Sequence, residues 1–289
     1  MYRVLKTSLL TFLLFSIVSL KTFGLSSFFL NENGIISERE RINLLLEYQT
    51  IQRYLPSMRE YTTTKISLKG IYPPNSNVEL GFEIPYFKIN EANDSGTLGD
   101  IRLSSKFSVF KELFEFIDMF IFQTTFNLKI NLATGIKKED GYRNIGLQKV
   151  LYYPLSSGYS DLEIGFSSSL VGTMFAISVC SSFISVSSKI EPPLAFNTEN
   201  DNIMIGTTLE LFLHYSKDFN LKIFGETTYF IPVSEKSKYQ DILLIGGGLW
   251  SRFFKNGIIK IGYYKNLLEP KYLENTFNNT VIISIGVRI

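Results

Sequence analysis

The residue best suited to catalysis in this sequence is His214, the only histidine of the chain. An imidazole can act as a general base, and a lipid-modifying hydrolase would need a serine and an acidic or amide partner beside it. Glu210 lies four residues earlier, but in a strand this separation is about 13 Å, too long for a hydrogen-bonded pair. No Gly-x-Ser-x-Gly motif surrounds any serine. We therefore predict that the protein is not an enzyme, with a lipid-modifying hydrolase as the weaker alternative.

The sequence does not support a metal site or a nucleotide site either. Cys180 is the only cysteine, it lies far from His214 in the sequence, and no ligand cluster accompanies either residue. The glycine-rich stretch IGGGLW, residues 245–250, lacks the lysine and the serine or threonine of a phosphate-binding loop. In a strand, such glycines mark a bend or close packing. The sequence predicts no metal and no cofactor.

Most polar side chains instead recur at every second residue, opposite rows of apolar side chains. In IFQTTFNLKINLATG, residues 121–135, phenylalanine and leucine occupy one parity and glutamine, asparagine and lysine the other. A two-residue period predicts β-strands, and its recurrence along the chain predicts an all-β fold. The candidate functional residues in these polar rows are Glu79, Glu83, Arg102, Lys106, Gln123, Asn127, Lys129, Glu163, Glu210, Lys222 and Glu226.

The length of these rows favours a membrane barrel over a soluble sheet. With Phe120, the 121–135 stretch keeps its alternation for about thirteen residues, roughly 43 Å at about 3.3 Å per residue. A transmembrane strand needs only about 9 to 11 residues. In such a barrel the apolar rows face lipid and the polar rows line an enclosed lumen. A secreted soluble barrel or sandwich also alternates, and it remains an alternative.

Turn signals divide the chain into about twelve strands with connections that alternate between short and long, the pattern of an up-and-down antiparallel transmembrane β-barrel. The longest connection, from Thr134 to Gly158, is a candidate lid. Aromatic residues near the strand ends predict two interfacial girdles, among them Tyr61, Tyr72 and Tyr264. The predicted strands are 41–53, 60–71, 77–90, 99–111, 117–133, 159–171, 173–188, 202–216, 219–233, 240–254, 257–267 and 279–289.

The first 24 residues read as a secretory signal, which leaves residues 25–289 for the barrel. Arg3 and Lys6 precede an apolar run from Leu9 to Leu20, and small residues follow at positions 22 and 24. Removing the signal changes the formal charge from +2 to about −1, because Arg3, Lys6 and Lys21 are lost, so a nucleic-acid partner is not expected. The expected location is the bacterial outer membrane, with outer-membrane lipid and the barrel-assembly machinery as partners. The sequence does not determine the oligomeric state.

Several blocks resemble a known family. VELGFEIPYFKI followed by GTLGDIRLSSKF, then LKINLATG, LSSGYSDLEIGFSSSL and LLIGGGLWSRFFKNGIIKIGYY are similar, in this order, to the outer-membrane transporter family called the MetA-pathway of phenol degradation family. The chain departs from the family at Thr97, Ala133 and Ile289, where glycine, proline and phenylalanine are common. The positions that match its motifs are Ile84, Pro85, Tyr86, Gly99, Asp100, Ile101, Leu132, Thr134, Gly135, Gly158 and Asp161.

The resemblance implies an outer-membrane β-barrel that passes small, often hydrophobic molecules. We therefore expect a passive channel or transporter whose solute is a small molecule. Both signs of charge occur in the polar rows, which predicts cross-strand ion pairs such as Glu83 with Lys106 and Glu210 with Lys222. A structural or adhesive surface barrel without transport is the main alternative, because its polar interior would show the same rows.

Overall fold

The computed structural model describes residues 41–54, 60–90, 96–115, 119–132, 134–135, 142–145, 148–151, 161–186, 201–216, 218–233, 242–254, 256–268 and 276–289. The predicted signal, residues 1–24, lies outside this part of the chain. No helix in the described ranges has the length and apolar content needed to cross a membrane. The strands are β1 (Asn43–Tyr54), β2 (Glu60–Asn75), β3 (Val78–Ile89), β4 (Thr97–Leu98), β5 (Ile101–Glu115), β6 (Met119–Leu132), β7 (Tyr142–Ile145), β8 (Gln148–Leu151), β9 (Asp161–Val171), β10 (Phe175–Val186), β11 (Asn202–Tyr215), β12 (Phe219–Pro232), β13 (Ile242–Phe253), β14 (Gly257–Asn266) and β15 (Thr276–Arg288).

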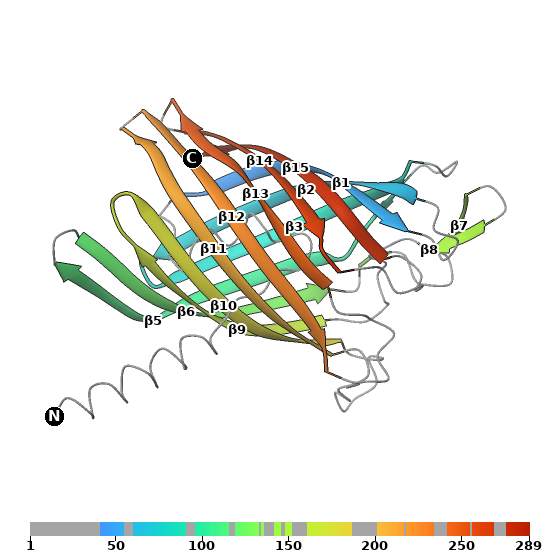
Figure 1. The fold of residues 1–289 in the computed structure, drawn as a ribbon, viewed down its shortest axis with the longest axis horizontal. Helices are drawn as coiled ribbons and strands as arrows, with labels where there is room; N and C mark the ends of the chain where they lie inside the picture. The colour runs from blue at the N-terminus through green and yellow to red at the C-terminus, as the bar shows by residue number, and fades with distance from the viewer. Residues whose placement is uncertain are drawn as a thin grey trace.

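Twelve long strands form one closed antiparallel barrel, as predicted (Figure 1). Each long strand pairs with its neighbours along the chain, and the barrel closes where β1 pairs with β15, in a register that joins Asn43 to Arg288. The additional strand β4 pairs only with β3, at Tyr86 and Phe87. Closure satisfies the backbone polar groups that lipid would leave without partners.

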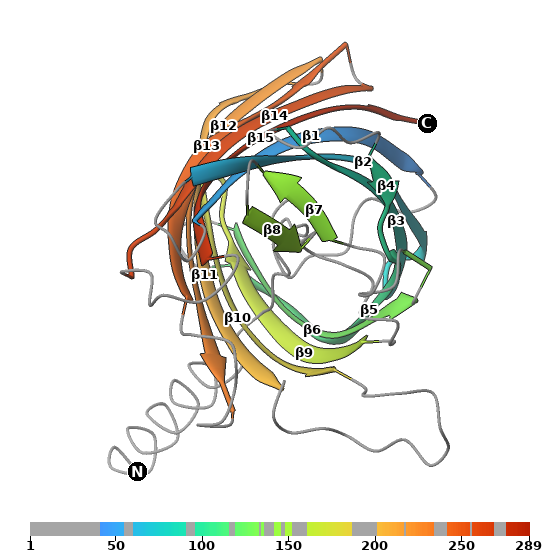
Figure 2. The same ribbon diagram turned by 90° about the vertical axis from the view of Figure 1, so that its right-hand side faces the viewer.

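The two ends of the barrel differ in the length of their connections. Two or three residues join the strands at one end: 76–77, 116–118, 172–174, 216–218 and 254–256. The other end carries the longer segments, of which 133–160 contains the hairpin of β7 and β8. This hairpin lies beyond the strand ends in Figure 1 and in front of the barrel opening in Figure 2. The sequence pattern missed both of these short strands.

Burial is inverted relative to a soluble protein. Apolar rows are exposed on the outside, as at Leu209 (48%) and Ile285 (58%), whereas charged residues on the inside are covered, as at Lys69 (0%). The outer surface also carries a row of aromatic rings on adjacent strands, in which Phe126 lies 6.4 Å from Phe107 and 5.3 Å from Phe166 between ring centroids. An apolar outer surface and a polar enclosed interior are the requirements of a barrel in lipid.

The predicted aromatic girdles are wrong in part. Tyr72 and Tyr263 are exposed on the outer surface, near the short-turn end and the long-loop end respectively. Tyr61 and Tyr264 are almost fully buried, and they occupy inward-facing positions of β2 and β14. A strand-end tyrosine can belong to either face, because only its parity relative to the inward row decides where the ring points.

A β-bulge in β11 reverses the parity of its last residues. Phe212 pairs with Lys222, but His214 pairs with Leu221, so the register shifts by one residue between them. His214 consequently leaves the inward row of Glu210 and lies exposed on the outer side, where its ring is tilted against that of Phe219 with 5.6 Å between the centroids. Bulges reorient side chains in this way.

Candidate channel interior

The side chains predicted to face the lumen lie on the inner wall. Their exposures range from 0% at Gln123 to 7% at Glu163 and Glu226, and only Arg102 is more open. They are contributed by β3, β5, β6, β9, β11 and β12, and strand alternation turns them all to the same side. Buried charges need partners, because an unpaired ion loses its hydration without compensation.

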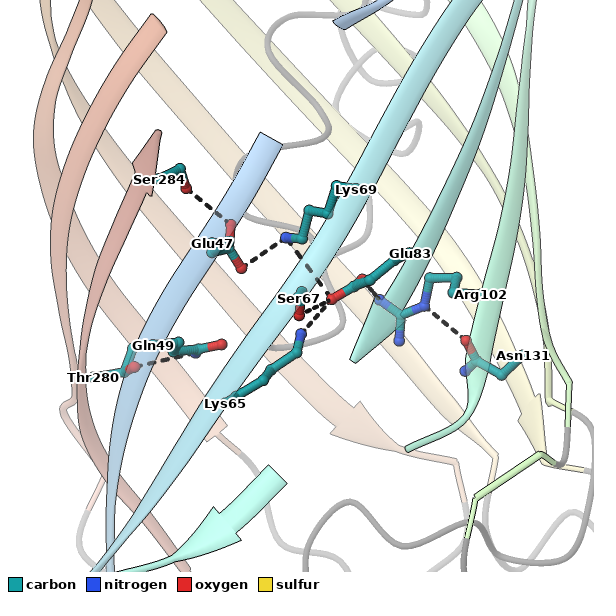
Figure 3. A network of polar contacts seen from close by, with 10 residues as sticks. All are labelled: Glu47, Gln49, Lys65, Ser67, Lys69, Glu83, Arg102, Asn131, Thr280 and Ser284. Atoms are coloured by element: carbon teal, nitrogen blue, oxygen red, sulfur yellow. Dashed lines mark hydrogen bonds and ion pairs between the residues drawn. The ribbon is translucent and has the colours of Figure 1, made fainter. Parts of the chain in front are cut away.

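Part of the inner wall carries a continuous network of ions and hydrogen bonds, which we call the ion-pair belt (Figure 3). Lys69 donates from Nζ to Glu47 Oε1 at 2.7 Å and lies 3.9 Å from Glu83 Oε1. Glu83 also pairs with Lys65 and accepts a hydrogen bond from Ser67 Oγ at 3.0 Å. The belt consists of Ser284, Glu47, Lys69, Ser67, Lys65, Glu83, Arg102 and Asn131.

The ends of the belt reach neighbouring strands on both sides. Ser284 Oγ donates to Glu47 Oε2 at 3.2 Å across the junction of β15 and β1. Arg102 Nη1 lies 3.7 Å from Glu83 Oε2, and its Nε donates to Asn131 Oδ1 at 2.7 Å. The belt therefore crosses β15, β1, β2, β3, β5 and β6, including the strands that close the barrel.

Other ion pairs lie between adjacent strands. Lys129 Nζ lies 2.9 Å from Glu163 Oε1, on residues directly opposite each other in β6 and β9. Lys222 Nζ lies 2.9 Å from Glu210 Oε2, which confirms the pair predicted between β12 and β11. Lys222 also lies over the Trp250 ring, 4.6 Å from its centroid.

The predicted pair of Glu83 with Lys106 is wrong. The register of β3 and β5 places Glu79 opposite Lys106, with a 3.0 Å ion pair, and Glu83 opposite Arg102. The alternation correctly identified the face of each residue. It did not give the offset between strands, and a shift of four residues selects another carboxylate on the same face.

Glu47 is a charged residue of this site that the sequence reading missed. It lies in β1 and is 1% exposed, between the inward-facing residues Leu45 and Ile51. These apolar neighbours share its parity, so the row does not alternate cleanly between polar and apolar residues. A single glutamate in NLLLEYQTIQRY was the available signal.

The inner wall also carries an apolar cluster, which the sequence reading did not anticipate, among buried polar residues of the same strands such as Thr208, Glu226 and Lys260. Six inward-facing residues form one buried cluster, each at most 1% exposed, and Phe224, Phe230 and Ile242 pack against it. We call this cluster the apolar arc. Its members are Ile51 on β1, Ile282 on β15, Tyr264 on β14, Leu244 on β13, Met204 on β11 and Cys180 on β10.

Within the arc, Tyr264 reaches over a glycine to contact a buried carboxylate. Glu226, Gly246 and Tyr264 occupy one register row on β12, β13 and β14. A Cβ atom on Gly246 would lie 2.1 Å from Tyr264 Cδ1, so the missing side chain makes room for the ring. Tyr264 thereby donates its hydroxyl to Glu226 Oε2 at 2.9 Å. The IGGGLW stretch thus supports close packing.

The charged side chains of the inner wall are covered by their neighbours and leave little space between them. A small cavity of about 20 Å³ lies beside two ion pairs, and it is large enough to hold a water molecule. The lining residues are Ile71, Glu79, Gly81, Ser104, Ser105, Lys106, Asn127 and Lys129.

His214 and Glu210 cannot act as a catalytic pair in this arrangement. Glu210 is inward-facing, 3% exposed and paired with Lys222, whereas His214 lies on the outer side after the bulge. The geometry thus agrees with the sequence argument that these two residues are too far apart for general base chemistry.

Comparison with known proteins supports the fold. No family model matches the chain, and no curated protein matches it. It is similar to the COG4313 outer membrane channel from Pseudomonas putida F1, with a TM-score of 0.58 and 11% identity over 89% of this chain and 98% of that one. The resemblance to the MetA-pathway family therefore stays a prediction.

Two further solved structures are less similar. The NanC porin has a TM-score of 0.46 and 7% identity, over 86% of this chain and 100% of that one. The translocator domain of the autotransporter NalP from Neisseria meningitidis has a TM-score of 0.45 and 10% identity, over 89% and 91% of the two chains. Of these three, only the channel from Pseudomonas putida is similar enough for an inference, and it shows that this chain shares the β-barrel fold of that outer-membrane channel.

Proposed function

We propose that this protein is a passive channel of the bacterial outer membrane through which small, in part hydrophobic, solutes diffuse. The observation that carries the proposal is the inverted barrel, with exposed apolar rows outside and buried polar and charged rows inside. Lipid accounts for the outer rows. Paired charges and amides on the inner wall supply contacts that replace part of the water shell of a passing solute.

The proposed lid is the connection after β6, which carries the β7 and β8 hairpin over the opening (Figure 2). Its first residues are held against the start of β5. Ile101 donates its backbone N–H to Thr134 Oγ1 at 2.9 Å, and the N–H of Gly135 donates to Asp100 Oδ1 at 2.9 Å. An anchored base and a hairpin placed over the mouth suit a segment that controls access.

Single-channel recording in planar bilayers tests the proposal. We expect salt-dependent current, and a shift toward cation selectivity in the charge-reversal variant Lys129→Glu, because this residue lies on the inner wall beside the narrow cavity. Deleting residues 142–151 should raise the open-channel conductance. His214→Ala, on the outer side, is the matched control and should conduct as the parent protein does.

A structural barrel without transport is the second candidate, favoured by the nearly complete burial of the inner side chains. The same recordings separate the two functions. A folded barrel that carries no current before and after removal of the hairpin supports the structural function and contradicts the channel.

A further inference from the structure

We propose that the lumen selects amphipathic solutes with a negatively charged group, such as small aromatic carboxylates. This inference rests on the proposed channel function and specifies its substrate class. Its basis is that the inner wall carries both the ion-pair belt and, on neighbouring strands, the apolar arc.

The two surfaces meet on β1 and β15. Glu47 of the belt and Ile51 of the arc lie on the same face of β1, and Ser284 and Ile282 lie two residues apart on the same face of β15. Two residues along a strand span about 7 Å. A molecule the size of one substituted ring is therefore long enough to touch an apolar side chain of the arc and a polar group of the belt together.

The close packing of the inner side chains makes these contacts matter. Members of the arc are at most 1% exposed, and the side chains of the charged wall are also covered. A passing solute must displace the groups that cover these side chains and exchange its water for wall contacts, and the free-energy cost is lowest when each part of the solute finds a matching surface. An inorganic ion gains nothing from the arc, and a neutral hydrocarbon gains nothing from the belt.

The sign of the charge follows from the described inner side chains near the belt. Five cations, Lys65, Lys69, Arg102, Lys106 and Lys129, face four carboxylates, Glu47, Glu79, Glu83 and Glu163. The three cations around Glu83 share one carboxylate between them, although Lys69 also pairs with Glu47. An added anion is better accommodated there than an added cation.

The test is block of the chloride current of the full-length barrel in planar bilayers by benzoate, acetate and benzyl alcohol. We expect benzoate to block at a concentration at least about tenfold below that of either other compound, equivalent to about 1.4 kcal/mol. Equal block by benzoate and acetate would overturn the role of the arc. Equal block by benzoate and benzyl alcohol would overturn the role of the charge.

Variants assign the effect to the two surfaces. Leu244→Asn should remove the advantage of benzoate over acetate, and Lys65→Gln should remove its advantage over benzyl alcohol. Ser182→Ala is the matched control, because Ser182 lies on the inner wall directly opposite Met204 but outside the arc. Faster gel migration of the unboiled protein checks that each variant is folded. Unchanged benzoate block in folded Leu244→Asn contradicts the inference.

A barrel that carries no current refutes the proposed function. In that case a measurement of benzoate binding tests the inference. Trp250 is the only tryptophan, and its ring lies against Lys222 on the inner wall. Benzoate, unlike acetate, should change its fluorescence in a saturable way, and this change should be lost in Leu244→Asn. A fluorescence that does not respond to benzoate overturns the inference.

Discussion

The ion-pair belt and the apolar arc occupy the inner wall of the same barrel, yet they stabilise it by different means. The belt holds β15, β1, β2, β3, β5 and β6 together through buried charges that depend on one another. The arc packs six apolar residues, supported by Gly246, which leaves room for the Tyr264 ring. Loss of a belt carboxylate leaves unpaired charges, whereas loss of an arc side chain leaves a cavity.

The largest expected effect is the loss of the central carboxylate of the belt. Glu83→Gln leaves Lys65, Lys69 and Arg102 without their shared anion, which should lower the free energy of unfolding by about 3–5 kcal/mol. Urea unfolding of the lipid-reconstituted barrel measures this change. Glu163→Gln, which removes a single ion pair with Lys129, should cost less, and the reverse order would contradict the cooperative belt.

A smaller loss is expected from truncation within the arc. Leu244→Ala removes a fully buried side chain and should cost about 2–4 kcal/mol in the same unfolding measurement. Leu209→Ala is the matched control on the outer surface, where lipid fills the space and the cost should be near 1 kcal/mol. Equal losses at both positions would show that the arc is not a packed core.

The third-largest loss of stability is expected when a methyl group is added beneath the Tyr264 ring. Gly246→Ala brings a Cβ within 2.1 Å of Tyr264 Cδ1 and 2.4 Å of the Tyr263 carbonyl oxygen, so we expect a loss of about 1–3 kcal/mol. Because the backbone contact persists, the Tyr264→Ala background should relieve only part of it. Gly225→Ala is the control, since its nearest atom would be 4.0 Å away, and its unfolding should be almost unchanged.

The smallest effect should be found at the bulge of β11. His214→Ala removes an exposed ring that contacts Phe219, which should change the free energy of unfolding by about 0.5 kcal/mol or less. Glu210→Ala, four residues away on the inner side, leaves Lys222 without its carboxylate and should cost several times more. Similar losses at the two positions would place both residues on the same face, contrary to the bulge.

The sequence by itself determined the strands and their faces. Predicted strand bounds such as 202–216 and 219–233 agree closely with β11 and β12, because the two-residue alternation reports which side chains share a face. The inward orientation of Gln123, Asn127 and Lys129 follows from the same rule. The short strands β4, β7 and β8, which have two to four residues and therefore no such rows, were missed.

Only the tertiary structure decided how these faces combine. Register selected Glu79 as the partner of Lys106, and a single bulge moved His214 to the outside. The apolar arc takes one residue from each of six strands, so no local run of apolar residues in the sequence indicates it. Alternation is a property of one strand, whereas pairing offset, bulges and clusters depend on hydrogen bonds and packing between strands, which the order of residues does not display.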